Sequence, residues 1–183
     1  MRIISGELKT RSIKAPKGQE FRPTTDRVKE NVFNILGERT RGANVMDLYA
    51  GSGSLGIEAL SRGAKRALFI DNSKEAAEVI KKNLEDLNID NKADVIKGDA
   101  VNELRRLVEG GFIFDLIFLD PPYNIEVVKL RDIFTLLAKC FSSSGLIVFE
   151  SGTDLSDSLV ASIKEIDKRE YGSTKIYFLK KTG

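Results

Sequence analysis

Short apolar runs alternate with amphipathic stretches along most of the chain. The runs carry few polar positions on either face, which predicts strands buried in the middle of a sheet. Between the runs, apolar residues recur at intervals of three and four, the spacing of one face of a helix. The predicted strands are residues 44–49, 67–71, 93–97, 114–119 and 146–150, and the predicted helices are residues 54–61, 74–87, 100–108 and 127–141. This alternation predicts a parallel sheet with crossover helices.

The carboxyl end departs from that alternation. Residues 164–171 and 175–180 are strand-like, and Gly172-Ser173 between them is a signal for a two-residue hairpin. An antiparallel hairpin that closes a parallel sheet distinguishes a methyltransferase sheet from a dinucleotide-binding sheet. We therefore predict an α/β fold with a seven-stranded, mostly parallel sheet that ends in a C-terminal antiparallel hairpin.

The amino end has a pattern of its own. Residues 2–5 and 10–15 read as two short strands, and a helix follows with Thr25 as its N-cap. This predicts a small N-terminal extension, made of a β-hairpin and a helix, over residues 1–42. The main domain is then expected to span residues 43–183.

Charge separates the same two parts of the chain. The sequence has a net charge of +2, yet residues 1–42 hold ten of the 29 Lys and Arg residues and five of the 27 Asp and Glu residues. The extension is therefore basic and the remainder slightly acidic. A basic arm favours a polyanionic partner, although a solvated basic surface would give the same counts.

Residue types that the sequence lacks exclude several chemistries. There is no histidine and only one cysteine, Cys140. Ser-His and Cys-His nucleophiles, a cysteine metal cluster and an internal disulfide are thereby excluded, so no metal site is expected. Cys140 lies in a predicted helix and is interpreted as a packing residue. Without an apolar run of about 20 residues or a signal-peptide pattern, we expect a cytoplasmic protein.

A glycine-rich loop follows the first predicted strand of the main domain. The run Asp47-Leu48-Tyr49-Ala50-Gly51-Ser52-Gly53 places it where ligands of open α/β sheets bind. With Gly56, the glycines also fit a dinucleotide fingerprint, so they do not identify the ligand. A carboxylate at Asp47 suits a cationic ligand better than a pyrophosphate. S-adenosylmethionine has an ammonium and a sulfonium and no phosphate, so it is the predicted cofactor, with S-adenosylhomocysteine as product. The predicted contacts in the loop are Asp47, Tyr49, Ala50, Gly51, Ser52 and Gly53.

Further carboxylates follow the next two predicted strands. Asp71 ends the second and is placed to accept hydrogen bonds from the ribose hydroxyls, whereas Asp99 follows the third and is placed to accept one from the adenine amino group. Each precedes a predicted helix, so each is alternatively a helix N-cap. The remaining predicted cofactor contacts are Asn72, Ala100 and Asp120.

The fourth predicted strand runs directly into Asp120-Pro121-Pro122-Tyr123. The prolines lack backbone N–H groups, which leaves their carbonyls free to accept hydrogen bonds. Asp120 and the Pro121 carbonyl could each accept one N–H of an –NH₂ group, while Tyr123 stacks on the ring that carries it. We therefore predict methyl transfer to a planar nitrogen, with Asp120, Pro121, Pro122 and Tyr123 as catalytic residues. Taken with the sheet, the expected fold is the class I, Rossmann-like methyltransferase fold.

Several longer runs carry a resemblance to a known family. They are Arg2-Ile3-Ile4-Ser5-Gly6, Arg22-Pro23-Thr24-Thr25-Asp26-Arg27, the loop described above, Glu58-Ala59-Leu60-Ser61-Arg62-Gly63-Ala64 and Phe118-Leu119-Asp120-Pro121-Pro122-Tyr123. With them the chain resembles bacterial 16S ribosomal RNA (guanine-N2)-methyltransferases of the RsmD type over nearly its whole length. The resemblance implies methylation of N2 of one guanine in 16S rRNA, within an assembled or partly assembled small subunit. A monomer is the expected state.

Two questions stay open from the sequence. The predicted RNA contacts are Arg2, Lys9, Arg11, Arg22, Thr24 and Arg27. Arg22 and Arg27 could instead pair with a carboxylate, such as that of the cofactor, or pack at the start of a helix. The tetrapeptide chemistry would also serve adenine N6 in DNA or RNA, or a glutamine amide in protein.

Overall fold

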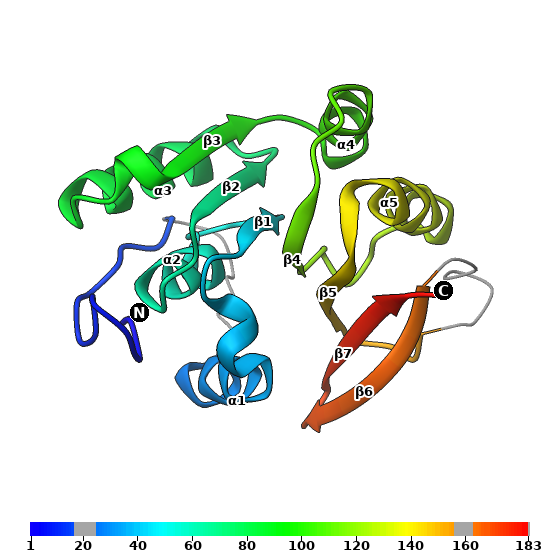
Figure 1. Cartoon of the computed structure of the whole chain (residues 1–183), viewed down its shortest axis with the longest axis horizontal. Coiled ribbons are helices and arrows are strands. Elements are labelled where there is room, and N and C mark those ends of the chain that lie inside the picture. The colour runs from blue at the N-terminus through cyan, green and yellow to red at the C-terminus, as the bar shows by residue number, and fades with distance from the viewer. Residues whose placement is uncertain (17–24, 156–162, 183) are drawn as a thin grey trace.

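The computed structural model describes residues 1–16, 25–155 and 163–182. Within those ranges it contains a seven-stranded sheet with helices on both faces (Figure 1). The helices are α1 (Asp26–Leu36), α2 (Ser54–Ser61), α3 (Lys74–Asp86), α4 (Ala100–Glu109) and α5 (Val127–Cys140). The strands are β1 (Asn44–Leu48), β2 (Arg66–Asp71), β3 (Ala93–Lys97), β4 (Phe114–Leu119), β5 (Phe141–Ser151), β6 (Ile163–Tyr171) and β7 (Thr174–Lys181).

The sheet has the order β3-β2-β1-β4-β5-β7-β6. Neighbours among the first five strands are parallel, whereas β7 runs antiparallel to both β5 and β6. Gly172, with a φ of 62°, and Ser173 form the turn between β6 and β7, beside the paired residues Tyr171 and Thr174. The predicted α/β fold, with its C-terminal antiparallel hairpin, is confirmed.

Apolar side chains fill two layers on opposite faces of the sheet. Successive strand residues point to opposite faces, so Phe118 joins the layer under α1, α2 and α3 while Ile117 joins the layer under α4 and α5. The Phe118 ring lies 5.5 Å from that of Phe33 in α1. Strands buried on both faces explain the continuous apolar runs in the sequence. Cys140 is fully buried in the second layer, which confirms the packing interpretation.

The predicted N-terminal β-hairpin is much reduced. The two strands expected at residues 2–5 and 10–15 are replaced by one antiparallel bridge, between Arg2 and Ser12. Ile3 and Ile13 are nevertheless buried in the main core. Backbone hydrogen bonds from the N–H groups of Ile3, Thr10 and Ile13 still join the two segments, and the turn between them packs on α2. The prediction of two strands was wrong, although that of a helix capped by Thr25 was right: the Thr25 hydroxyl accepts from the Val28 N–H at 3.3 Å.

Most strand boundaries that differ from the prediction do so by one residue, and two of the differences have a clear physical cause. β5 begins at Phe141 rather than at residue 146, because polar residues 142–144 gave no apolar signal and the β4–β5 register shifts after the Phe114–Phe141 pair. β1 ends one residue early because Tyr49 has a positive φ of 64° and leaves the sheet. The second difference matters for the site, since it starts the glycine loop.

The N-terminal segment is held to α2 by a buried acid. Glu58 has no solvent exposure and accepts hydrogen bonds from the backbone N–H groups of Ile4 and Ser5, at 2.8 and 3.0 Å. Arg62 and Lys29 lie 2.8 and 3.7 Å from the same carboxylate. Burial lowers the pKa of Lys29, while the charge of Glu58 acts in the opposite direction. One residue of α2 therefore ties residues 1–16 and α1 to the sheet domain; the boundary at residue 42 stays a prediction.

Candidate active site

The glycine loop turns sharply where β1 ends. Tyr49, Gly51 and Gly53 have φ angles of 64°, 55° and 75°, a region that favours glycine. The backbone N–H groups of Tyr49 and Ala50 both donate to the Ile70 carbonyl of β2, at 3.0 and 3.1 Å. The loop is therefore fastened to the neighbouring strand before Gly53 begins α2 as its N-cap.

Asp47 lies beneath this loop, 2% exposed, and accepts a hydrogen bond from the Gly56 N–H at 2.9 Å. A Cβ on Gly56 would stand 2.3 Å from the Phe69 ring, so this glycine lets α2 approach β2. Burial, opposed by that hydrogen bond and reinforced by Asp71, raises the pKa of Asp47 to about 7. The third glycine of the apparent dinucleotide fingerprint thus has a packing role, while Asp47 is a buried acid poised to titrate near neutrality.

Asp71 and Asp99 act differently although both end strands and precede helices. Asp71 accepts from the N–H groups of Gly51 and Ser73, each at 2.8 Å, and Ser73 is the N-cap of α3. Asp71 therefore orders the glycine loop, and the alternative of an N-cap is wrong for it. Asp99 is the N-cap of α4, accepting from Val101 and Asn102 through Oδ1.

Lys129 of α5 is a neighbour of Asp99 that sequence reasoning missed. Its Nζ lies 2.8 Å from Asp99 Oδ2, and this contact lowers the pKa of Asp99. Lys129 belongs to α5, which begins after Asp120-Pro121-Pro122-Tyr123, so no local pattern connects it with Asp99. The sequence assigned Asp99 to an adenine amino group; in the structure its Oδ1 caps α4 and its Oδ2 contacts the Lys129 ammonium.

Asp120-Pro121-Pro122-Tyr123 leaves the end of β4 beside β1. Pro121 is buried, whereas Pro122 and Tyr123 are exposed, with Tyr123 at 50%. Burial and the nearby charges of Glu150 and Asp47 raise the pKa of Asp120 well above its usual value. The carboxylate, the proline carbonyl and an open aromatic ring are thus presented together at one edge of the sheet.

Glu150 is a further site residue that the sequence analysis did not name. The register pairs Leu119 with Phe149, so the next residues, Asp120 just after β4 and Glu150 near the end of β5, lie side by side. The Tyr123 hydroxyl lies 3.3 Å from Glu150 Oε1 and also 3.3 Å from Thr174 Oγ1. A carboxylate that directly follows an apolar strand was the signal used for Asp71 and Asp120, and the same signal would have found Glu150.

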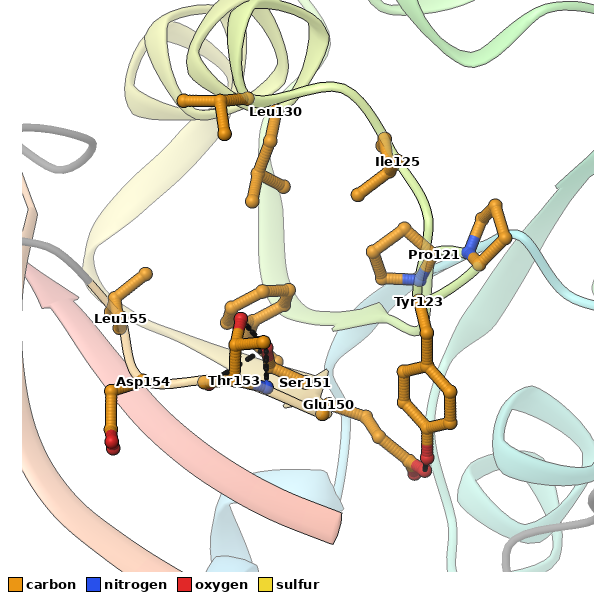
Figure 2. A pocket seen from close by; sticks show the side chains of 13 residues that line it. Pro121, Tyr123, Ile125, Leu130, Glu150, Ser151, Thr153, Asp154 and Leu155 are labelled. Carbon is orange, nitrogen blue, oxygen red and sulfur yellow. Dashed lines mark hydrogen bonds between the residues drawn. The ribbon is translucent and has the colours of Figure 1, made fainter. Parts of the chain in front are cut away.

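A cavity of about 230 Å³ opens beside the tetrapeptide. Figure 2 shows Pro121 and Tyr123 on one side, Leu130 of α5 above, and Glu150 and Leu155 from the chain that ends β5. Asp120 does not line it. The cavity therefore adjoins the tetrapeptide without including Asp120, and both Tyr123 and Glu150 contribute to its lining.

The order of the strands sets the acidic residues in one row. Asp99, Asp71, the glycine loop over Asp47, Asp120 and Glu150 follow one another across β3, β2, β1, β4 and β5. Asp47, Asp71 and Asp120 form no salt bridge with any residue in the described ranges. Such a row suits a ligand with positive charge and disfavours a phosphate. These carboxylates suit the cationic groups of the predicted cofactor.

The predicted RNA contacts lie in two places. Arg2 reaches Asp26 at 3.3 Å, next to exposed Arg27 at the start of α1. Arg11 donates to the Asp86 carbonyl at the end of α3, at 2.9 Å, and Lys9 is exposed nearby in sequence. Arg22 and Thr24 lie outside the described residues. Within the described ranges, no acidic or cysteine cluster suits a metal ion, and no helix could cross a membrane.

Comparisons with known proteins agree with this geometry. Residues 1–180 match the family described as "Conserved hypothetical protein 95". The chain is 40% identical over 186 residues to "Putative rRNA methyltransferase YlbH" of Bacillus subtilis, covering 100% of each. It is 38% identical over 130 residues to "Ribosomal RNA small subunit methyltransferase D" of Haemophilus influenzae, covering 70% of this chain and 67% of that protein. The solved structure of "Putative methyltransferase yhhF" from Escherichia coli superposes with a TM-score of 0.85 at 29% identity, over 99% of this chain and 97% of the other.

Proposed function

The chain belongs to the Conserved hypothetical protein 95 family, the RsmD type, and from this premise we propose that it methylates N2 of a guanine in small-subunit ribosomal RNA, with S-adenosylmethionine as donor. The observation that carries the proposal is Asp120-Pro121-Pro122-Tyr123 at the end of β4, beside the glycine loop of β1. In that position the tetrapeptide would receive the amine next to the residues that would receive the cationic cofactor.

The residues of β1, β2 and β3 would hold the cofactor. The loop backbone of Ala50, Gly51 and Ser52 and the buried charge of Asp47 suit its cationic amino-acid end. Each oxygen of Asp71 accepts one backbone N–H and keeps a further lone pair for the ribose hydroxyls. Asp99 would bind the adenine amino group through Oδ2, which it shares with Lys129. When bound, the cofactor supplies an electrophilic methyl group.

The tetrapeptide would hold and orient the guanine amine. Asp120 and the Pro121 carbonyl accept its two N–H groups, which favours a pyramidal nitrogen whose lone pair points at the methyl group. Tyr123 is half exposed and offers its ring for stacking. No strong base is needed before attack, because the nitrogen becomes acidic as it gains the methyl group. The raised pKa of Asp120 makes this carboxylate a suitable proton acceptor, directly or through water.

The test is incubation with cofactor labelled in the methyl group. Naked 16S RNA, small subunits, partly assembled subunits, DNA and ribosomal protein are offered separately, and the labelled nucleotide is then mapped. We expect label on N2 of one guanine, with an assembled or partly assembled subunit as the best substrate because a short chain must borrow specificity from the shape around its target. Label on adenine N6 or on a protein amide would overturn the proposal.

The pH dependence of cofactor affinity is expected to follow Asp47. Its pKa of about 7 means that the cofactor-free protein holds a neutral Asp47 at pH 6 and a charged one at pH 8. A cationic ligand prefers the charged form, so affinity for S-adenosylhomocysteine should rise about tenfold between those pH values. Titration calorimetry at pH 6, 7 and 8 measures it. Asp47→Asn should bind weakly with a flat profile; an unchanged profile in that variant would assign the titration to another group.

Neutralising Arg22 and Arg27 together is expected to weaken RNA binding and flatten its salt dependence. For each phosphate that the protein no longer neutralises, the slope of log affinity against log salt should fall by about 0.7 to 0.9. Filter binding at several salt concentrations measures this. The matched control removes Lys65 and Lys92, exposed residues that precede β2 and β3 at the opposite edge of the sheet. If the slope stays unchanged for Arg22 and Arg27, these residues have a cofactor-binding or structural role instead.

A further inference from the structure

Glu150 stands at the catalytic edge without a role in methyl transfer. It is the penultimate residue of β5, directly beside Asp120, and it contributes to the raised pKa of that carboxyl. Amine binding needs one carboxylate and one carbonyl, and both are supplied by the tetrapeptide. Two carboxylates this near repel each other, and a ligand that donates hydrogen bonds to both would relieve that repulsion.

The contact with Tyr123 orients the Glu150 carboxylate. The Tyr123 hydroxyl is 3.3 Å from Glu150 Oε1, and Figure 2 shows the two side chains meeting tip to tip at the rim of the cavity. A Cβ on Gly152 would stand 3.1 Å from the Tyr123 ring, so the ring lies close to the chain that follows β5. A base stacked on Tyr123 would therefore have Glu150 at its edge. A carboxylate has about four lone-pair sites, so it can accept from a ligand while it keeps its contact with Tyr123.

The edges of the bases decide what such a pair of carboxylates can bind. Guanine presents two neighbouring donors, the N2 amino group and the N1–H. Adenine presents its N6 amino group beside N1, which is an acceptor, and a glutamine side chain has no ring N–H beside its amide. Two adjacent acceptors at Asp120 and Glu150 match the donor–donor edge of guanine and oppose the donor–acceptor edge of adenine.

We propose that Glu150 is the specificity-determining residue of this site: its carboxylate accepts the N1–H of the target guanine while Asp120 and the Pro121 carbonyl accept the two N2–H groups. The inference rests on the proposed function and deepens it, since the tetrapeptide alone does not distinguish one planar amine from another. Glu150 touches the substrate and takes no part in the transfer itself.

The test compares guanine with 2-aminopurine at the mapped position, in small subunits reconstituted from ligated 16S RNA. 2-Aminopurine keeps the amino group on C2, but its N1 is an acceptor. The wild-type enzyme should prefer guanine in kcat/KM by about 100-fold or more, since a buried acceptor loses its partner. In Glu150→Gln the amide can accept from N1–H or donate to N1, so the preference should fall below about tenfold. 2-Aminopurine also lacks O6, but a preference due to O6 would not respond to this substitution.

The matched control is Glu165→Gln, an exposed glutamate on β6 given the same change of charge. It should keep the wild-type preference, and melting temperatures verify that all variants fold. If Glu150→Gln were inactive on both substrates, the preference for guanine over 2-aminopurine would be measured in Glu150→Asp instead. A slow enzyme that still prefers guanine supports the proposal, and one without preference overturns it.

Two results separate this inference from the proposed function. Equal methylation of guanine and 2-aminopurine by the wild type, or an unchanged preference in an active Glu150→Gln enzyme, overturns the role of Glu150 and leaves guanine-N2 methylation intact. Label mapped to adenine or to protein in the earlier experiment overturns both.

Discussion

Asp120→Ala is expected to lower the single-turnover rate of methyl transfer by at least about 10² to 10³-fold, the loss seen when one transition-state hydrogen bond is removed. The substitution leaves the amine with only the Pro121 carbonyl as acceptor and no longer aims its lone pair. Affinity for the cofactor should stay within about threefold, because the loss of one charge from the acidic row is partly offset by relief of repulsion with Asp47.

The fold should survive this change. A carboxyl whose pKa is raised by burial disfavours its charged form in the folded protein, so its removal should not lower the melting temperature near neutral pH. Rapid-quench kinetics and calorimetry measure rate and affinity separately. Asp132→Ala, an exposed aspartate on α5, is the matched control and should behave as wild type. Near-normal turnover in Asp120→Ala would defeat the assignment of the amine receptor.

Glu58→Gln is expected to destabilise the protein by about 3 to 5 kcal/mol, the usual effect of removing one partner from a buried ion pair. Lys29 is 1% exposed and would keep a buried positive charge whose acidic neighbour is gone. The amide NH₂ group would also face donors, since the carboxylate accepts from Ile4, Ser5 and Arg62. Both effects act on the junction between the N-terminal segment and α2.

Urea denaturation measures the free energy of unfolding. Glu78→Gln is the matched control: its partner Lys74 lies 3.6 Å away on the exposed surface of α3, and the expected change is within about 0.5 kcal/mol. Hydrogen exchange should show Ile4 and Ser5 losing protection first, because their N–H groups donate to Glu58. A Glu58→Gln protein as stable as the control would show that packing of Ile3 and Ile13 alone holds the segment.

The sheet could be predicted from the sequence because each central strand is buried on both faces. Their apolar runs are therefore continuous, and β3 and β4 have the predicted bounds. The N-terminal strands could not be predicted correctly, since Ile3 and Ile13 lie in short runs that read as strands but are buried in the main core without forming a ladder. Periodicity reports which side chains are buried, not which element buries them.

The candidate site, like the fold, could be predicted from the sequence only in part. The ends of strands are visible in the sequence, so the positions of Asp47, Asp71 and Asp120 at the carboxyl edge of the sheet could be predicted. Local sequence could not decide between capping and ligand binding for Asp71 and Asp99, because both uses place an acid before a helix. The contacts of Lys129 with Asp99 and of Tyr123 with Glu150 join residues about 30 positions apart. Only the packing of α5 and the register of β4 with β5 bring them together.

The place of β5 in the sheet has a consequence for the shape of the RNA target. The strand is paired on both sides, with β4 and with β7, where Glu150 lies opposite Ile176. Asp120 and Glu150 thus stand on interior strands, whose backbones cannot move outward without breaking hydrogen bonds on two sides. A guanine within a helix has its Watson–Crick edge covered by cytosine. The base must therefore be unpaired and swung out of its stack to meet the two carboxylates, so we expect the target in a loop or bulge rather than in a continuous stem.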